Sequence, residues 1–212
     1  MVDWSALLLL GAYHGLNPGM GWLFAVALGM QRGSARGVFR AILPISAGHA
    51  ASVAMVLLAA MVVQRIVEPS VMRSASAAAL IALGLYMLWR HPRLRYGGMV
   101  VGFGELAVWS FLMASAHGAG LMLLPFVLDG SVSVSAASMD HSMHEVVRGQ
   151  MTPIAAAVAV GAHTLSYFTV MTTAAWLVYR KLGLALLRAA WFDMDRMWAA
   201  VLLITGAVIF FA

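Results

Sequence analysis

The chain has 212 residues, of which 63% are apolar and 10% charged, and its mean hydropathy is +0.90. This composition excludes an ordinary soluble globular domain and predicts an integral membrane protein. The net charge of +5 comes from 13 Lys and Arg against 8 Asp and Glu. In a membrane protein such an excess marks the cytoplasmic side and requires no nucleic-acid partner. The chain has no cysteine, which excludes disulfides, thiolate metal sites and cysteine-bound iron–sulfur clusters.

Six apolar segments follow one another along the chain, separated by charged residues and turn formers. Their bounds are about 4–30, 40–64, 74–89, 103–128, 153–179 and 194–211. Because a membrane-spanning helix needs about 20 apolar residues, we expect an all-α integral membrane protein with six transmembrane helices in a single domain, residues 1–212. Thr152 before Pro153 is a typical N-cap and first helical position for the fifth segment.

The Lys and Arg residues are distributed unevenly among the connections. Those after odd-numbered segments are Arg32, Arg36, Arg40, Arg90, Arg93, Arg95, Arg180, Lys181, Arg188 and Arg196, and those on the opposite side are Arg65, Arg73 and Arg148. The side richer in basic residues is expected in the cytoplasm. This predicts a multi-pass protein of the bacterial inner membrane with both termini in the periplasm. The first segment lacks a preceding positive region and a cleavage site, so we interpret it as a span rather than a signal peptide.

A weak internal repeat relates residues 1–97 to residues 98–212. The matching features are Trp4-Ser5 and His14-Gly15 against Trp109-Ser110 and His117-Gly118, Gly48-His49 against Ala162-His163, and Gly84 against Gly206. Two units of three helices each enter the membrane from opposite sides, which predicts two inverted three-helix repeats with a site near the bilayer midplane. Chance similarity between apolar segments is the alternative explanation.

Four histidines lie deep inside predicted spans: His14, His49, His117 and His163. Counted from the polar boundaries at about 1.5 Å per residue, each lies roughly 14 to 16 Å into the membrane. Ionisable groups at that depth usually face the interior of a helix bundle, where they mark ion pathways or cofactor sites. A neutral histidine bonded to a neighbouring helix is the alternative for any one of them. Four at one depth favour a shared site.

The run from His14 to Gly21 predicts an interrupted helix. Pro18 has no N–H group, so the carbonyl of His14 loses its helical partner, and Gly15 and Gly19 favour unwinding. Freed carbonyl oxygens beside His14 and Asn17 resemble the broken helices with which transporters coordinate cations. In the fourth segment Pro125 frees the carbonyl of Leu121 in a similar way.

The connection at residues 129–151 is predicted to lie outside the cell membrane on the external face. It contains Met139, His141, Met143 and His144 within six residues. Thioether sulfur favours Cu(I), and imidazole accepts Cu(II), Zn or Ni. We expect an external loop that collects or releases metal, and a flexible polar connection is the alternative.

The runs at residues 15–20 and 28–33 resemble the lysine-exporter superfamily, whose members are small six-span carriers built from three-plus-three inverted repeats. His14-Gly15-Leu16 and Gly48-His49-Ala50 are also similar to the nickel/cobalt transporter relatives of that superfamily. Those carry a His-x-x-Asp-x-Asp-His run on one span and a Gly-His-Ser run on the next. Three ligand positions depart here, because Asn17, Gly19 and Met20 stand where the family has Asp, Asp and His.

These features together predict a secondary transporter of a transition-metal cation, with copper the first choice and nickel or cobalt next. The expected metal ligands are His14, Asn17, His49, His117 and His163. No P-loop, H-E-x-x-H or G-x-S-x-G run occurs, so neither ATP hydrolysis nor another enzymatic activity is expected. An amino-acid or small-metabolite exporter, a haem-binding redox membrane protein and a metal-delivery accessory subunit remain alternatives. A homo-oligomer or a periplasmic metal-binding partner is compatible with each.

Overall fold

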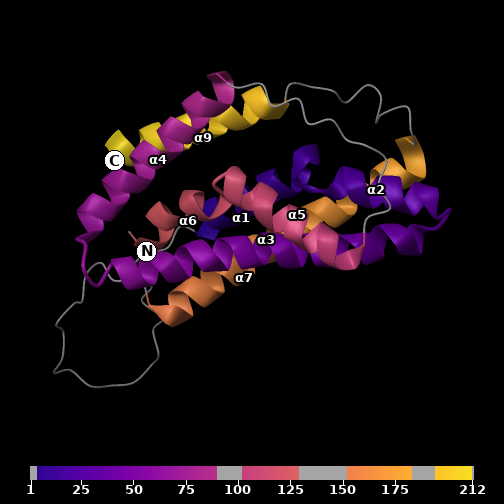
Figure 1. Ribbon diagram of the computed structural model, residues 1–212, viewed down its shortest axis with the longest axis horizontal. Helices are drawn as coiled ribbons and strands as arrows, with labels where there is room; N and C mark the ends of the chain where they lie inside the picture. Colours follow the sequence, from indigo (N-terminus) through magenta and orange to yellow (C-terminus); the bar gives the residue numbers. More distant parts are fainter. Residues whose placement is uncertain (1–3, 90–101, 129–151, 183–193, 212) are drawn as a thin grey trace.

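The computed structural model describes residues 4–89, 102–128, 152–182 and 194–211, and within these ranges it contains helices and no strand. The elements are α1 (Trp4–Leu16), η1 (Pro18–Met20), α2 (Trp22–Gln31), α3 (Ala35–Val63), α4 (Pro69–Trp89), α5 (Phe103–Ala116), α6 (Ala119–Leu128), α7 (Pro153–Leu177), η2 (Val178–Leu182) and α9 (Met194–Phe211). Figure 1 shows α4 and α9 side by side as a layer set apart from the other helices.

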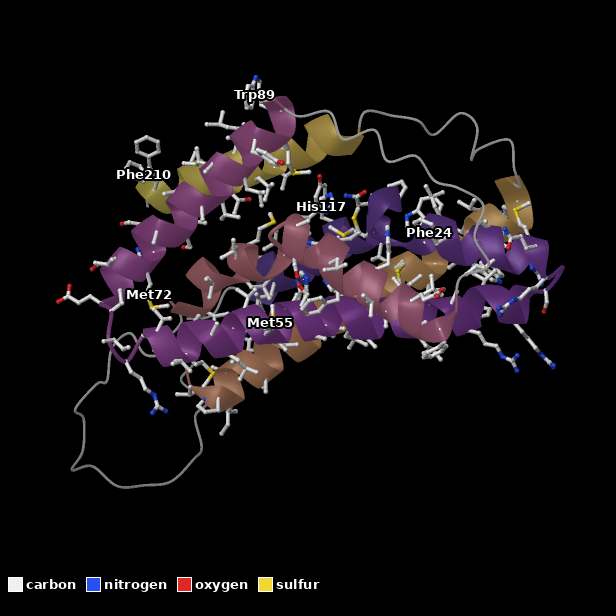
Figure 2. All side chains as sticks on the ribbon, viewed as in Figure 1. Phe24, Met55, Met72, Trp89, His117 and Phe210 are labelled. Carbon is white, nitrogen blue, oxygen red and sulfur yellow. The ribbon has the colours of Figure 1, made fainter. Side chains whose placement is uncertain are left out.

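Three helices are long and apolar enough to cross a membrane: Ala35–Val63, Ser70–Trp89 and Pro153–Lys181. The shorter apolar helices are Trp4–Leu16, Trp22–Gln31, Phe103–Ala116 and Ala199–Phe211. Large apolar side chains cover the outside of the molecule, and Figure 2 shows Trp89 and Phe210 pointing away from it. Within the described ranges the chain is therefore helical throughout its regular structure, with three helices that are candidates to span a membrane, as its composition predicts.

Several helix boundaries follow capping residues rather than the edges of the apolar segments. Thr152 caps α7 as predicted, since its hydroxyl oxygen accepts a hydrogen bond from the N–H of Ala155 at 3.2 Å. The helix α3 begins at Ala35, five residues before the apolar segment, because the Ser34 hydroxyl accepts from the N–H of Arg36. Hydropathy locates the apolar part of a helix but not its capping residue. The start of α3 predicted at about residue 40 is therefore wrong by more than one helical turn.

The first apolar segment is interrupted at the run that contains Pro18. The helix α1 ends at Leu16, and Asn17 adopts an extended conformation and accepts a hydrogen bond from the N–H of Gly19 at 2.9 Å. Gly21 then has φ +124°, a backbone conformation that residues other than glycine rarely adopt, and α2 begins at the next residue. The indole N–H of Trp22 donates to the carbonyl of Leu16 at 3.0 Å. The break is thus closed by local hydrogen bonds.

The fourth apolar segment is also interrupted, but not where its proline lies. The helix α5 ends at Ala116, Gly118 has φ +69°, and α6 runs through Pro125 to Leu128. The break therefore lies at Gly118, where the positive φ favours a glycine, and α6 continues across Pro125.

The helices pair in a reciprocal pattern. The most extensive contacts join α1 to α7, α3 to α5, and α4 to α9. Close backbone approach sustains the first two pairs: a Cβ atom at Gly15 would lie 2.5 Å from the carbonyl oxygen of Tyr167, and one at Gly48 would collide with the carbonyl oxygen of Ala107. Because α3 also packs against α7, the end of α1 and the middles of α3 and α7 lie close together.

Candidate functional site

Three of the predicted histidines meet in the interior of the molecule. His14 comes from α1, His49 from α3 and His163 from α7, and the exposed fraction of each side chain is 0%. The distances between ring centroids are 5.4 Å for His14 and His49, 5.1 Å for His14 and His163, and 5.5 Å for His49 and His163. We call these three residues the histidine cluster. His163 lies more than 100 positions after His14 and His49 in the sequence, so the cluster joins the two halves of the chain.

The two facing histidines of the cluster interact through their Nε2 atoms. The distance from Nε2 of His49 to Nε2 of His163 is 3.3 Å, and the two rings are nearly parallel, with an interplanar angle of 14°. At that distance one neutral ring donates its N–H and the other accepts. The Nδ1 atom of His49 is buried and, within the part of the chain that the structure describes, has no hydrogen-bond partner.

His14 is oriented by its own helix. Its Nδ1 lies 2.7 Å from the carbonyl oxygen of Leu10, and because a carbonyl only accepts, Nδ1 carries the proton. In the neutral ring the lone pair is then on Nε2, the nitrogen further from the backbone. Metal-binding histidines in proteins commonly donate their other ring N–H to a carbonyl in this way. His14 is thus held in the tautomer that a metal ligand needs.

Tyr167 adds an aromatic wall to the cluster, and the sequence analysis did not identify it. Its ring stacks on His49 with centroids 4.0 Å apart, and its hydroxyl group donates to the carbonyl oxygen of Met20 at 2.8 Å. It lies four residues after His163, so both side chains occupy one face of α7. That spacing was the available signal. Tyr167 connects the cluster to the helix break, since Met20 ends η1.

The remaining predicted positions in the first segment shape the backbone. Asn17 caps η1 through its side-chain oxygen, and Pro18 and Gly19 form that turn. Gly15 lies in the last turn of α1, where the backbone of α7 leaves no room for a side chain. The structure therefore assigns Asn17, Gly15, Pro18 and Gly19 to the break beside the cluster.

His117 ends α5 at the second break and is 7% exposed. Figure 2 labels it near the junction of α5 and α6. Its Nδ1 lies 2.7 Å from the carbonyl oxygen of Met113, four residues earlier, which repeats the geometry of His14 and Leu10. His117 thus resembles His14 in its local bonding but stands outside the three-ring contact.

Part of the predicted site lies outside the described residues. Met139, His141, Met143 and His144 belong to the segment 129–151, so the structure gives no position for the external metal-collecting loop. Within the described ranges, no group of three or more His, Asp or Glu side chains is arranged so that it could hold a metal ion. The cluster as described is a bonded imidazole pair with a third imidazole edge-on to both.

No family model, curated protein or solved structure matches the chain. The chemistry of the cluster therefore has to be inferred from its own residues. Among the described residues, the buried polar side chains belong to His, Asn and Ser, together with the hydroxyl group of Tyr167. Neutral imidazole nitrogens are the strongest potential metal ligands in that set.

Proposed function

We propose that the protein is a secondary transporter that moves a transition-metal cation across the bacterial inner membrane through the histidine cluster. The observation that carries this proposal is the meeting of three fully buried imidazoles from three helices. Placing three ionisable side chains in a membrane interior is costly, and such groups are usually retained for function. As in the sequence-based prediction, copper is the first candidate substrate and nickel or cobalt the next.

The spacing of the facing pair suits a shared metal ion. Zinc, the reference for tetrahedral imidazole sites, binds nitrogen at about 2.0–2.1 Å, which places two ligand nitrogens of one ion about 3.3 Å apart. The two Nε2 atoms of His49 and His163 are 3.3 Å apart. A cation can therefore replace the proton between them without a change in this distance, while each ring tilts so that its lone pair points at the ion. One of the two rings changes tautomer when this happens, since both Nε2 atoms must then carry lone pairs.

His14 supplies the third ligand of the proposed site. Its Nδ1–H bond to Leu10 places the lone pair on Nε2. Its ring stands edge-on to the other two, with centroids 5.4 and 5.1 Å away. The proposal requires Nε2 of His14 to approach the Nε2 atoms of the pair when the ion binds. Imidazole ligands without carboxylate or thiolate suit copper, nickel, cobalt and zinc rather than magnesium or calcium.

The reciprocal helix contacts support a six-span architecture of two inverted repeats. In such a repeat α1 corresponds to α5, α3 to α7, and α4 to α9. The contact of α1 with α7 is then equivalent to the contact of α5 with α3, and α4 packs against its own counterpart α9. Gly84 packs against Leu203 of α9, and Gly206 packs against Ile81 of α4, which follows the same correspondence. Inverted repeats of this kind move a central site between two openings by rocking one half against the other. In this arrangement the buried cluster corresponds to a closed state.

The same packing disfavours two alternatives. A haem between paired histidines needs a slot for its porphyrin plane, whereas α1 and α7 approach at Gly15 without room for one Cβ atom. A carboxylate-bearing substrate such as an amino acid needs a cationic partner or a helix N-terminus. Among the described residues no Lys or Arg is buried. These observations favour a bare cation as the substrate.

Metal flux into proteoliposomes tests the proposed function. We expect Cu(I), Ni(II) or Co(II) to enter liposomes that contain the wild type, and flux to be abolished in His14→Ala and His49→Ala at equal incorporation. Ser76→Ala is the matched control, because Ser76 is a 4% exposed polar residue that bonds the carbonyl of Arg73 within α4, in the separate layer. Flux that is equal in His49→Ala and the wild type, or no flux of any of the three ions, would contradict the proposal.

A further inference from the structure

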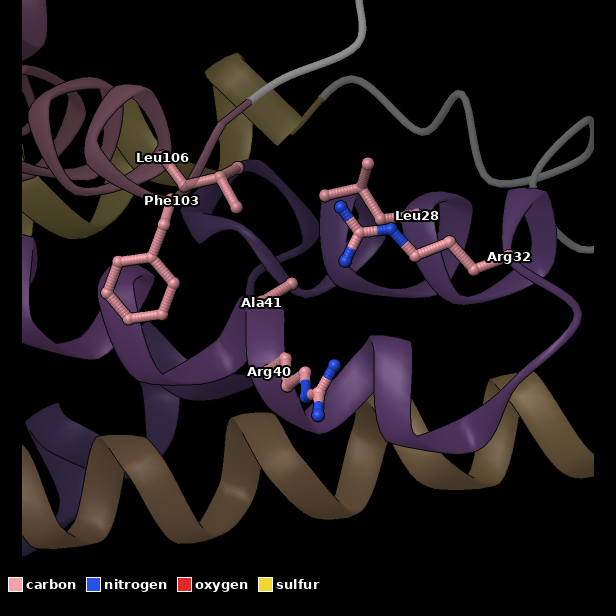
Figure 3. A pocket seen from close by; sticks show the side chains of 6 residues that line it. All are labelled: Leu28, Arg32, Arg40, Ala41, Phe103 and Leu106. Carbon is pink, nitrogen blue, oxygen red and sulfur yellow. The ribbon is translucent and has the colours of Figure 1, made fainter.

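A pocket of about 260 Å³ lies at the end of the bundle where α2 stops, α3 starts and α5 starts. Its walls are formed by Leu28, Arg32, Arg40, Ala41, Phe103 and Leu106. Figure 3 shows that Arg32 comes from the end of α2 and Arg40 from α3, while Phe103 and Leu106 approach from α5. The histidine cluster uses none of these residues. The pocket is therefore separate from the histidine cluster.

Two arginine residues contribute to a pocket whose surface is mostly apolar. Arg32 and Arg40 are the charged residues among the lining side chains, and both are exposed. The nearby acid of α5, Glu105, does not line the pocket, and its carboxylate accepts a hydrogen bond from the N–H of Gly102 at 2.9 Å. Arginine forks bind phosphate oxygens in pairs, so two of them facing one pocket suit a phosphate group.

The remaining walls are apolar and continue onto the outside of the helices. Leu28, Ala41 and Leu106 are buried, and Phe103 is 64% exposed beside them. A free anion gains nothing from such walls, whereas an amphiphile places its acyl chains along them. The pocket also lies at the ends of apolar helices, the level at which lipid headgroups meet a membrane protein. Basic pockets between membrane helices are typical sites for anionic lipid headgroups.

We propose that this pocket binds an anionic phospholipid, with its phosphate held by Arg32 and Arg40 and its acyl chains against Phe103 and Leu106. The inference goes beyond the proposed transport function, because it requires neither a metal ion nor the histidine cluster. It identifies the lipid by its chemistry, a phosphodiester with a net negative charge on two acyl chains. The bound lipid ties α2, α3 and α5 together at one end of the bundle.

The test is lipid binding to the purified full chain in a neutral detergent, measured by native mass spectrometry and thermal unfolding. The probes are phosphatidylglycerol, phosphatidylcholine and inorganic phosphate. The variants are Arg32→Gln, Arg40→Gln, the double variant and Arg32→Lys. Arg36→Gln is the matched control, since Arg36 is an exposed arginine at the same end of α3 that does not line the pocket.

We expect phosphatidylglycerol to bind the wild type and Arg36→Gln and to raise their unfolding temperature, and phosphatidylcholine and inorganic phosphate to have no effect. Each Arg→Gln change should weaken binding by about tenfold or more, as loss of a charge-assisted hydrogen bond does. Arg32→Lys keeps the charge, so its affinity for phosphatidylglycerol should lie between those of the wild type and Arg32→Gln. Equal binding of the two lipids, equal losses in Arg36→Gln and Arg32→Gln, or binding of inorganic phosphate that matches the lipid would overturn the proposal.

Discussion

At the scale of single residues, the histidine cluster is defined by hydrogen bonds that fix which nitrogen carries a lone pair. The carbonyl of Leu10 fixes His14, and the facing Nε2 atoms of His49 and His163 share one proton. The sequence predicted these residues because histidine is costly in a membrane interior. It did not predict Tyr167, since a tyrosine in an apolar helix carries no comparable energetic cost, and only its spacing of four residues from His163 placed it on the same helix face.

The four predicted histidines should differ in their effect on metal binding. Replacing His14 by Ala removes a ring of the cluster, so we expect affinity to fall by more than the roughly 10- to 100-fold that loss of an outer partner costs. His117→Ala removes a ring at the end of α5, outside the cluster, and should lower the metal affinity less than His14→Ala does. Calorimetric titration with Cu(I) measures both. A larger loss in His117→Ala would place the site elsewhere.

Tyr167 should act on stability more than on binding. Tyr167→Phe keeps the ring on His49 but leaves the buried carbonyl of Met20 without its donor, which costs about 1–3 kcal/mol. We therefore expect a lower unfolding temperature and a metal affinity closer to the wild type than that of His49→Ala. An unchanged unfolding temperature together with lost binding would show that the hydroxyl group is itself a ligand.

At the scale of helices, the two breaks illustrate what a sequence reveals. The break at residues 17–21 was predictable, because Pro18 removes a hydrogen-bond donor and three glycines surround it. The break at Gly118 was not, because a glycine is compatible with a helix and becomes a turn only when tertiary packing selects a positive φ. Pro125, the stronger local signal, lies inside α6.

Close contact between α1 and α7 should make Gly15 sensitive to a single methyl group. Gly15→Ala places a Cβ atom 2.5 Å from the carbonyl oxygen of Tyr167, so the helices must separate at a cost of about 1–3 kcal/mol. Gly161→Ala is the control, because a Cβ atom there meets nothing within 4 Å, and alanine favours a helix by up to about 1 kcal/mol. The unfolding temperature should fall in Gly15→Ala and rise in Gly161→Ala. Equal shifts would contradict the described packing of α1 on α7.

At the scale of the whole molecule, the all-helical fold and its apolar surface followed from composition. The reciprocal pairing of α1 with α7 and α3 with α5 did not, because the repeat is weak and helix partners are set by small residues at close contacts. The position of the loop 129–151 could not be tested, since those residues lie outside the described ranges.

The absence of cysteine allows a direct test of the proposed orientation. Gln31→Cys labels the connection between α2 and α3, and Ile66→Cys labels the connection between α3 and α4; Ile66 is 85% exposed. With the basic side in the cytoplasm, a membrane-impermeant maleimide should modify the second variant in intact spheroplasts and the first only after permeabilisation. The opposite labelling pattern would show that the orientation is the reverse of the proposed one. Labelling of both variants in intact spheroplasts would contradict a membrane span between residues 31 and 66.

The most direct test of the central claim is the binding of Cu(I) to the purified protein, with X-ray absorption at the metal. The account predicts one ion per chain at the cluster, bound by imidazole nitrogens at about 2.0 Å. A variant with His14, His49 and His163 all replaced by Ala keeps the histidines of the segment 129–151 intact and should lose this site. The same stoichiometry, affinity and nitrogen ligands in that variant would contradict a metal site in the histidine cluster.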